Sequence, residues 1–286
     1  MHSLFMRFPG GRPKALTLSY DDAVREDVRL IGVMKEHGLK GTFNINSGLR
    51  VTPEEQAEIN SKRSYAFKST YDEVSELYAQ DGIEVAVHGL THPFLQTLPP
   101  AQVAYEILED RRRLEEQFGT IVRGMAYPQG TYSDTVVEVL RSCGIVYSRA
   151  VKSTERFDLP DNWLIWQPTC HHTNKRLTEI AQSFLDKPCN NLAHPQLFYL
   201  WGHAYEFEQF NNWYVIEDFA KMMGGHEEIW YATNIEIYDY IEAFRRLVFS
   251  VGMKKVYNPS ALPLWFCYHN QMYCVGAGET VVLDQI

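Results

Sequence analysis

The sequence predicts an α/β fold with a parallel β-sheet, and three observations favour that class. Seven short apolar segments alternate with stretches of helical periodicity, as in a sheet whose strands are joined by covering helices. A length of 286 residues is sufficient for one large domain with a substantial core. Acidic and histidine side chains follow several of the apolar segments, where parallel strands bring their carboxyl ends together. This length is compatible with closure of the sheet into a barrel, which the pattern alone does not establish.

The expected elements follow one another along the first 250 residues. Alternation of apolar side chains and short β-branched runs predict strands at residues 15–20, 41–46, 83–87, 122–127, 145–149, 197–202 and 229–232. Helical spacing of apolar residues between capping residues predicts helices at residues 24–37, 70–81, 99–118, 133–144, 175–186, 212–223 and 234–250. Residues 51–70 are expected to be a loop with helical turns. Residues 151–172 form a longer irregular loop, and loops of that length are often functional.

We expect a single domain over residues 1–286. Its core is expected at about residues 15–250, where strands and helices alternate. From residue 255 onward the pattern changes to short strands around His269 and the segment 276–278. We interpret this tail, about residues 255–286, as a small β appendage.

Composition and charge exclude several classes of protein. The net charge is −9, and the longest basic run is the triplet 111–113, which argues against nucleic acid as the partner. No apolar run is long enough to cross a membrane, and the N-terminus lacks a secretory apolar region. Five cysteines without paired short spacings predict reduced thiols and a cytoplasmic location. The sequence gives no indication of the oligomeric state.

Two adjacent aspartates, Asp21 and Asp22, close the first expected strand. Neighbouring carboxylates repel each other and are poorly placed beside a buried strand unless a positive centre lies close by. The alternative is that the pair caps the next helix, which is a frequent role of aspartate. The pair alone does not decide between a cation site and a cap.

A pair of histidines, His88 and His92, follows the third expected strand in the sequence HGLTH. On a helix this spacing places two imidazoles on one face, but Pro93 biases His92 away from helical geometry. We therefore expect a tight turn, with Gly89 permitting the bend. An isolated pair of this kind is more often structural than metal-binding. Combined with Asp22 from another strand end, it forms an Asp-His-His set that leaves coordination positions open for water and substrate.

Four segments together resemble the motifs of the polysaccharide deacetylases, carbohydrate esterase family 4, which have the NodB-homology fold. Residues 19–23 (SYDDA) resemble the first motif, with Tyr20 and Ala23 where phenylalanine and glycine are usual. Residues 88–92 (HGLTH) resemble the second, with Gly89 where serine or threonine is usual. Residues 126–130 (AYPQG) resemble the third, and residues 200–203 (LWGH) the last. The motifs span residues 15 to about 235 of the chain.

The resemblance implies a fold and a set of roles. The expected fold is a distorted (β/α)7 barrel with the small C-terminal β appendage. Asp21 would be the general base that activates water, and His203 the general acid that protonates the leaving group. Asp22, His88 and His92 would hold one divalent metal, with zinc favoured over cobalt, nickel or manganese. A backbone N–H near Gln129 would help to stabilise the oxyanion.

One departure from the family pattern concerns the partner of the base. Many members have an arginine at the position of Ala126, where it orients the catalytic aspartate. Arg123 and Arg149 are the candidates to replace it, and Arg149, at the end of the fifth expected strand, is better placed. The alternative is that Arg149 is a surface charge, as arginines frequently are.

Further residues are candidates for substrate contacts. Tyr127 and Trp201 could stack on a sugar ring, as could Tyr132, Trp163 and Trp166, although aromatic side chains more often belong to a core. Cys170, His171 and His172 could bind a second metal, but we expect them to line or rim the site, because a structural zinc site has four ligands at recognisable spacings.

The motifs therefore predict a metal-dependent hydrolase that removes N- or O-linked acetyl groups from an acetylated mono- or oligosaccharide. A hydrolase of a small non-sugar amide is an alternative, because the third motif is altered. A carbohydrate-binding protein without turnover is a second alternative. The intact acid and base argue against it, since a binding protein needs neither. The absence of a secretory signal favours small or intracellular substrates over a cell-wall polymer.

Overall fold

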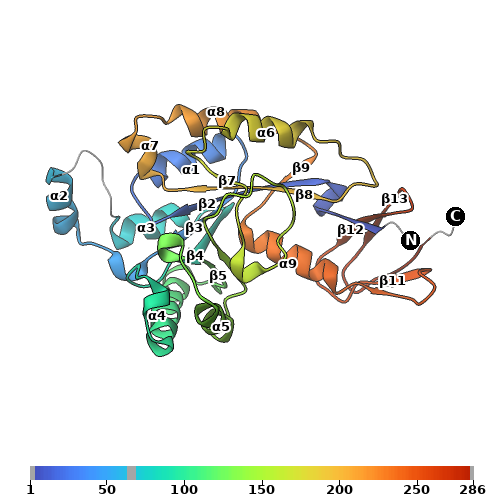
Figure 1. The fold of residues 1–286 in the computed structure, drawn as a ribbon, viewed down its shortest axis with the longest axis horizontal. Helices are drawn as coiled ribbons and strands as arrows, with labels where there is room; N and C mark the ends of the chain where they lie inside the picture. The colour runs from blue at the N-terminus through green and yellow to red at the C-terminus, as the bar shows by residue number, and fades with distance from the viewer. Residues whose placement is uncertain (1–3, 63–68, 284–286) are drawn as a thin grey trace.

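The computed structural model describes residues 4–62 and 69–283. A parallel sheet forms its centre and curls into a half-barrel of seven strands in the order β6-β5-β4-β3-β2-β8-β7, while β9 pairs with the first residues of β2 (Figure 1). The expected α/β class is thereby confirmed. The strands are β2 (Lys14–Asp21), β3 (Gly41–Ile45), β4 (Ile83–Val87), β5 (Gly124–Ala126), β6 (Tyr147–Arg149), β7 (Cys170–His171), β8 (Gln196–Gly202) and β9 (Ile229–Tyr231).

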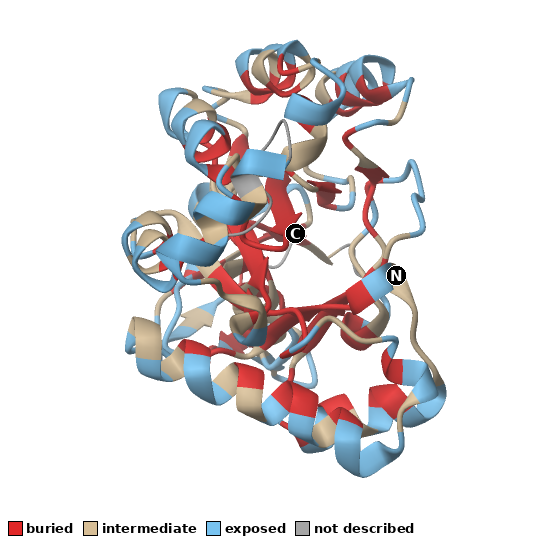
Figure 2. Cartoon of the chain, turned by 90° about the vertical axis from the view of Figure 1, so that its left-hand side faces the viewer, coloured by how far each residue is buried: buried red, intermediate tan, exposed pale blue. Residues whose placement is uncertain are grey.

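Helices cover the outside of the sheet in two groups. In Figure 1, α1, α6 and α8 lie along one side, and α4 and α5 lie on the opposite side. Figure 2 shows that the helices turn buried residues toward the sheet and exposed residues toward solvent, which is the expected behaviour of amphipathic helices. The helices are α1 (Asp27–Glu36), α2 (Pro53–Lys62), α3 (Tyr71–Tyr78), α4 (Pro100–Phe118), α5 (Asp134–Ser142), α6 (Leu177–Asp186), α7 (Tyr205–Gln209), α8 (Tyr214–Met223) and α9 (Asn234–Arg245). None of the helices among the described residues has the length and apolar character needed to cross a bilayer.

The two faces of β2 explain how the sheet supports a polar site. One face carries Leu16, Leu18 and Tyr20, which pack in the main apolar core beneath the helices. The other face carries Thr17 and Ser19, both buried, followed by Asp21 at the end of the strand. These polar side chains are hydrogen-bonded across the interior of the half-barrel, as buried polar groups must be. The polar lining thus runs along β2 directly to Asp21.

The segment 166–171 links the two edges of the sheet. At its start, the Trp166 N–H donates to the carbonyl of Ser148 in β6 at 2.9 Å. At its end, Cys170 and His171 form β7 and pair with β8. One segment therefore contacts β6 at one edge of the sheet and adds β7 beside β8 at the other.

A small antiparallel region completes the fold. Strand β1 (Leu4–Arg7) pairs with β12 (Leu264–Tyr268), which pairs with β13 (Gln271–Val275). A second small sheet contains β10 (Val248–Phe249), β11 (Lys255–Tyr257) and β14 (Thr280–Val282). The sequence predicted the C-terminal strands but not the participation of β1. The division of the chain into one domain with a core and an appendage remains a prediction.

Several element boundaries differ from expectation. The helix expected from residue 24 begins at Asp27, and Val28, expected to face inward, is 62% exposed. The inward face of the helix is formed by Leu30, Ile31 and Met34. The helix expected to reach residue 250 ends at Arg245 and is followed by β10.

The irregular segments also contain more structure than expected. The segment 51–70 contains the ten-residue helix α2, while residues 63–68 lie outside the described part of the chain. The segment 151–172 contains β7. The helix expected at 212–223 begins at Tyr214, with Trp213 rather than Asn212 at its N-cap. Strands β5 and β6 are each three residues long, shorter than the patterns suggested.

Candidate active site

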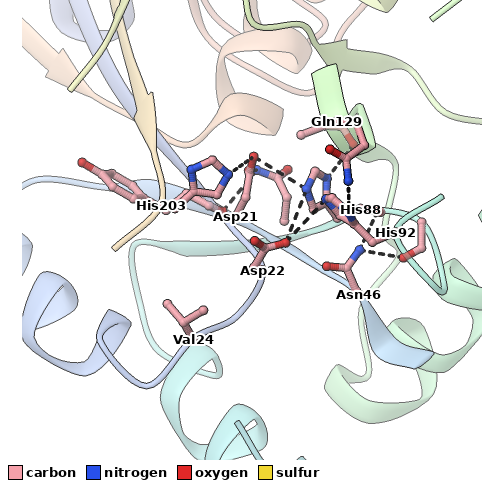
Figure 3. A network of polar contacts seen from close by, with 12 residues as sticks. Asp21, Asp22, Val24, Asn46, His88, His92, Gln129 and His203 are labelled. Carbon is pink, nitrogen blue, oxygen red and sulfur yellow. Dashed lines mark hydrogen bonds and ion pairs between the residues drawn. The ribbon is translucent and has the colours of Figure 1, made fainter. Parts of the chain in front are cut away.

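Asp22, His88 and His92 converge at the carboxyl ends of β2 and β4 (Figure 3). The Oδ1 atom of Asp22 lies 3.8 Å from Nε2 of His88 and 3.7 Å from Nε2 of His92. The three donor atoms lie within 4.8 Å of one another, and Asp22 and His88 are buried. A carboxylate and two imidazoles in this arrangement can hold a metal ion.

Tight turns after the strands bring these side chains together. Asp22 and Ala23 have φ angles of 78° and 50°, in a region that L-residues adopt at a cost. The Asp22 N–H donates to the carbonyl of Asn44 in β3, which holds the first turn against the sheet. Gly89 has a φ of 75°, and a Cβ there would lie 3.0 Å from Pro128, so glycine suits the second turn on both grounds. The turn expected after β4 is therefore present.

Hydrogen bonds fix the orientation of both histidines. Nδ1 of His88 lies 2.8 Å from the carbonyl of Ala126 and must donate to it, which leaves Nε2 with a free lone pair. Asn46 donates to the carbonyls of His88 and Gly89 at 2.6 and 2.8 Å and fixes the turn between the ligands. Nδ1 of His92 lies 3.0 Å from the amide of Gln129. His88 is thus prepared to ligate through the nitrogen that faces Asp22.

Asp21 lies deeper than Asp22 and is surrounded by donors. The Arg149 guanidinium donates to its Oδ2 atom, and Nδ2 of Asn44 donates to its Oδ1 atom at 2.8 Å. His88 and His203 approach the same Oδ2 atom at 3.7 and 3.8 Å. Burial alone would raise the pKa of Asp21, but Arg149, His88 and His203 together lower it to about 2. Asp21 is therefore ionised at neutral pH.

The register of two neighbouring strands explains why Arg149 reaches Asp21. Arg149 in β6 pairs directly with Ala126 in β5, the position at which many members of the family that the motifs resemble have an arginine. Paired residues on adjacent strands present their side chains side by side. The side chain of Arg149 is fully buried, so it is not a surface charge, and it stacks over Trp201 at 4.3 Å. The other candidate, Arg123, instead pairs with Asp239.

A cavity of about 610 Å³ opens above these residues. Tyr127, Gln129 and Trp201 line it, in agreement with their expected position. Arg149, His171 and His172 do not: Arg149 lies behind Asp21, and the two histidines face Glu206. The full lining is Asp21, Asp22, Leu49, His88, His92, Tyr127, Gln129, Gly130, Val151, Trp201, His203 and Tyr205.

Three of the aromatic residues expected to contact substrate make contacts within the protein instead. Tyr127 is only 1% exposed, and its hydroxyl donates to the carbonyl of Leu164 at 2.6 Å, so its ring rather than its hydroxyl faces the cavity. Trp163 and Trp166 are buried in the second apolar cluster and contribute to the core. Cys170 is also buried. Among the described residues, two groups could hold a metal ion, Asp22 with His88 and His92, and His171 with His203 and Glu206, and Cys170 belongs to neither.

Sequence reasoning missed two residues that contact the expected catalytic pair. Asn44 holds Asp21, and its position near the end of a strand, beside that of Asp21, could have indicated this contact. Glu206 lies 3.6 Å from Nδ1 of His203. Their spacing of three residues, the separation of neighbours on a helix, was the available signal.

The architecture and the site together define a class of protein. The chain is an α/β half-barrel with an Asp-His-His group, a second aspartate and a further histidine at the carboxyl ends of its strands. Residues 9–148 match the family model described as polysaccharide deacetylase. This match covers just under half of the chain and agrees with the resemblance to the polysaccharide deacetylases of carbohydrate esterase family 4 that the motifs implied. No curated protein matches the sequence.

The solved structures that match this chain are distant in sequence. A putative polysaccharide deacetylase from Mycobacterium smegmatis is 14% identical, with a TM-score of 0.57 over 83% of this chain and 93% of that chain. A family 4 carbohydrate esterase from Streptomyces lividans in complex with acetate is 17% identical, with a TM-score of 0.47 over 76% and 91%. The deacetylase PplD from Streptococcus pyogenes, in complex with acetate, is 22% identical, with a TM-score of 0.40. The match covers 47% of this chain and spans 55% of the length of PplD. The Mycobacterium smegmatis structure establishes a shared fold only.

Proposed function

We propose that this chain is a metal-dependent hydrolase that removes N- or O-linked acetyl groups from an acetylated mono- or oligosaccharide. The observation that carries the proposal is the grouping of Asp22, His88 and His92 with Asp21 and His203 around one cavity. Hydrolysis of an amide or ester requires a polarised carbonyl, an activated water and a proton donor for the leaving group. The match of residues 9–148 to the polysaccharide deacetylase model supports deacetylation as the reaction.

Asp22, His88 and His92 are the residues that would hold one divalent cation. Their donor set suits zinc, with cobalt, nickel and manganese as alternatives. The fit rests on His88, whose bond to the Ala126 carbonyl leaves Nε2 free to ligate. The amide nitrogen of Gln129 faces Nδ1 of His92, and a half-turn of this amide would bring its oxygen there to accept from Nδ1 in the same way. A cation bound there would polarise the acetyl carbonyl and lower the pKa of a water molecule.

Asp21 is the proton acceptor in this proposal. Arg149 and Asn44 hold the carboxylate in one orientation, with Oδ2 also within 4 Å of His88 and His203. Its pKa of about 2 ensures that it carries no proton when the reaction begins. The same low pKa makes it a weak base, since general-base catalysis is most efficient when the pKa lies near the working pH. Asp21 therefore depends on a water that is already acidified.

His203 is the proton donor. Its Nε2 atom lies on the cavity side, 3.8 Å from Asp21, and its ring is partly exposed. Burial lowers the pKa of His203, but Glu206, Asp21 and Asp22 together raise it above its ordinary value. A raised pKa favours the protonated imidazole that must supply a proton to the departing amine or alkoxide.

The substrate class follows from the cavity and the family. Trp201 and Tyr205 give the cavity aromatic walls, which suit the apolar faces of sugar rings. The acidic and histidine side chains lie at the floor of the cavity. We therefore place the acetyl group of the substrate at this floor and its sugar ring against the aromatic walls. Acetylated sugars therefore fit better than large apolar amides.

The test is acetate release by protein stripped of metal and then reloaded with zinc, cobalt, nickel or manganese. Chito-oligosaccharides, acetylated xylan oligomers and small non-sugar amides are the substrates. We expect release from an acetylated sugar by reloaded protein only. His88→Ala should lose metal and activity, whereas His194→Ala, which removes an exposed histidine packed on Phe5, should retain both.

Two results would overturn the proposal. Faster cleavage of a small amide than of every acetylated sugar would identify the chain as an amide hydrolase of another kind. Sugar binding by calorimetry without acetate release under any of the four metals would identify a carbohydrate-binding protein.

A further inference from the structure

A second polar cluster lies behind His203, away from the expected metal ligands. One oxygen, Oε2 of Glu206 in α7, faces three imidazole nitrogens. Nε2 of His172 lies 2.9 Å from it, Nε2 of His171 lies 3.3 Å from it, and Nδ1 of His203 lies 3.6 Å from it. These histidines come from β7 and from the end of β8, so three elements meet at one carboxylate.

The tautomer of His171 shows how the cluster is bonded. The backbone N–H of Thr173 points at Nδ1 of His171 at 3.2 Å, and the Thr173 hydroxyl lies 2.7 Å from the same nitrogen. A backbone N–H is always a donor, so Nδ1 must carry the lone pair. The hydrogen of neutral His171 is then on Nε2, which faces Glu206. The N–H of His171 is thus on the ring nitrogen that lies 3.3 Å from the carboxylate.

The same fact weighs against a second metal. Donor atoms of His171, His203 and Glu206 lie within 4.8 Å of one another, a spacing compatible with an ion. A ligating nitrogen must present a lone pair, however, and the Nε2 atom of His171 carries hydrogen. The cluster is better described as a carboxylate surrounded by three imidazole rings.

His172 makes the position of Glu206 rigid. It is 1% exposed, stacks on Tyr20 and Phe207, and lies against Gly202, where any Cβ would come within 2.1 Å of its ring. Burial lowers the pKa of His172 to about 4, so it is neutral at physiological pH. Glu206 in turn has a pKa far below its ordinary value: burial opposes this, but its histidine partners outweigh the burial. The cluster therefore carries one fixed negative charge beside His203.

We propose that Glu206, held in place by His171 and His172, is a positioning residue that keeps the proton on Nδ1 of His203 and directs Nε2 toward the cavity. The inference rests on the proposed function for the role of His203 as proton donor. Glu206 contacts neither the cavity nor the expected metal ligands, so it acts only through His203.

The groups that face His203 come from several elements. Asp21 and Asp22 approach from β2, and the charge of Asp21 is balanced by Arg149 in β6. The His171 ring packs 6.2 Å from that of His203. Glu206 is the charge nearest to Nδ1, so its removal should alter the protonation of His203 even with both aspartates present.

The first test measures His203 directly, without any need for turnover. Zinc-loaded protein with ¹³C-labelled histidine is titrated by NMR, and His203→Gln assigns the resonance among the ten histidines. In Glu206→Gln, which keeps the size of the side chain, we expect the midpoint of the His203 titration to move to lower pH. Glu208→Gln removes the same charge from the same helix, where Glu208 instead accepts from Trp213, and should leave the midpoint in place. An unchanged midpoint in Glu206→Gln would overturn the inference.

The second test separates proton donation from other effects. With an acetylated amine, Glu206→Gln should lower kcat by about 10–100-fold, less than the ~10²–10⁴-fold that general-acid catalysis supplies. With 4-nitrophenyl acetate, whose leaving group departs without a proton, the loss should nearly vanish, and KM should be unchanged for both. An equal loss on both substrates would show that Glu206 supports the structure rather than His203.

The metal content of the two proteins completes the test. Two bound zinc ions in the wild type and one in Glu206→Gln would identify the cluster as a metal site and refute the positioning role. A shifted titration in a protein that releases no acetate from any substrate would refute the proposed function but leave the contact between Glu206 and His203 established.

Discussion

The buried ion pair between Arg149 and Asp21 can be tested by a substitution that removes the charge of Arg149 but keeps an apolar side chain in its place. Replacing Arg149 by methionine removes the guanidinium from a fully buried position and leaves the carboxylate without its main partner. Removal of one member of a buried pair costs about 3–5 kcal/mol. The pKa of Asp21 gives a second figure: a shift from 3.8 to about 2 contributes ~2.4 kcal/mol at ~1.36 kcal/mol per unit. We expect Arg149→Met to lower the free energy of unfolding at pH 7 by roughly 2–5 kcal/mol.

The pH dependence of this loss has a definite sign. In the wild type the pKa of Asp21 is depressed, so its stabilising contribution is present above the unfolded value of 3.8 and is lost as pH falls toward 2. In Arg149→Met, burial remains and the opposing guanidinium is absent, so the pKa rises above the unfolded value. The folded variant then holds a proton that the unfolded chain releases, and its stability falls as pH increases. The difference from the wild type should therefore be larger at pH 7 than at pH 4.

Urea unfolding of metal-free protein at these two pH values measures the difference. The control is Asp21→Asn/Arg149→Met, in which no uncompensated charge remains and much of the lost stability should return. A loss below about 1 kcal/mol, the scale of an exposed pair, would refute the account of a buried pair. So would a loss of the same size at pH 4 and pH 7, or one that the double variant does not relieve.

The other predictions concern the metal, the two aspartates and one buried acid. His88→Ala should lose stoichiometric metal by elemental analysis, and full retention would exclude it as a ligand. Asp21→Asn should retain metal while kcat falls by about 10²–10⁴-fold, whereas Asp22→Asn should bind metal weakly and be partly rescued by excess zinc; the reverse pattern would exchange their roles. Burial raises the pKa of Glu84 to about 7, despite hydrogen bonds from Tyr147, Ile235 and Thr42, so the folded state holds its proton above the ordinary value of 4.5. Stability should fall as pH rises through this interval, and Glu84→Gln should flatten the decline in urea titrations; parallel curves would show that Glu84 does not titrate there.

The sequence predicted the residues of the site that directly follow the ends of strands. Parallel strands align their carboxyl termini, so Asp22 and His88, at the ends of separate apolar runs, could be placed together from the order of residues alone. The turns were predictable in kind, because Gly89 and Pro93 restrict the backbone. The positive φ of Asp22 was not, since nothing in its side chain requires that conformation.

The remaining parts depend on geometry that short segments do not encode. Strand β7 has two residues and forms because β8 offers it a hydrogen-bonding edge, not because of its own periodicity. Helix α7 has five residues, too few for a helical pattern, so Glu206 was not recognised. The choice between Arg123 and Arg149 depended on which strand lies beside β5.

The pairing of Arg149 with Ala126 has a consequence for how enzymes are recognised from their linear motifs. A side chain that is missing from one strand is supplied here by its lateral neighbour, some twenty positions further along the chain. A motif scan that tests each column separately would record a lost arginine and classify such a chain as inactive. Because paired residues on adjacent strands lie side by side, a charged side chain can be carried by either strand and still occupy the same place in space. Tests for degenerate family members should therefore ask whether an arginine reaches the buried aspartate, rather than at which sequence position it stands.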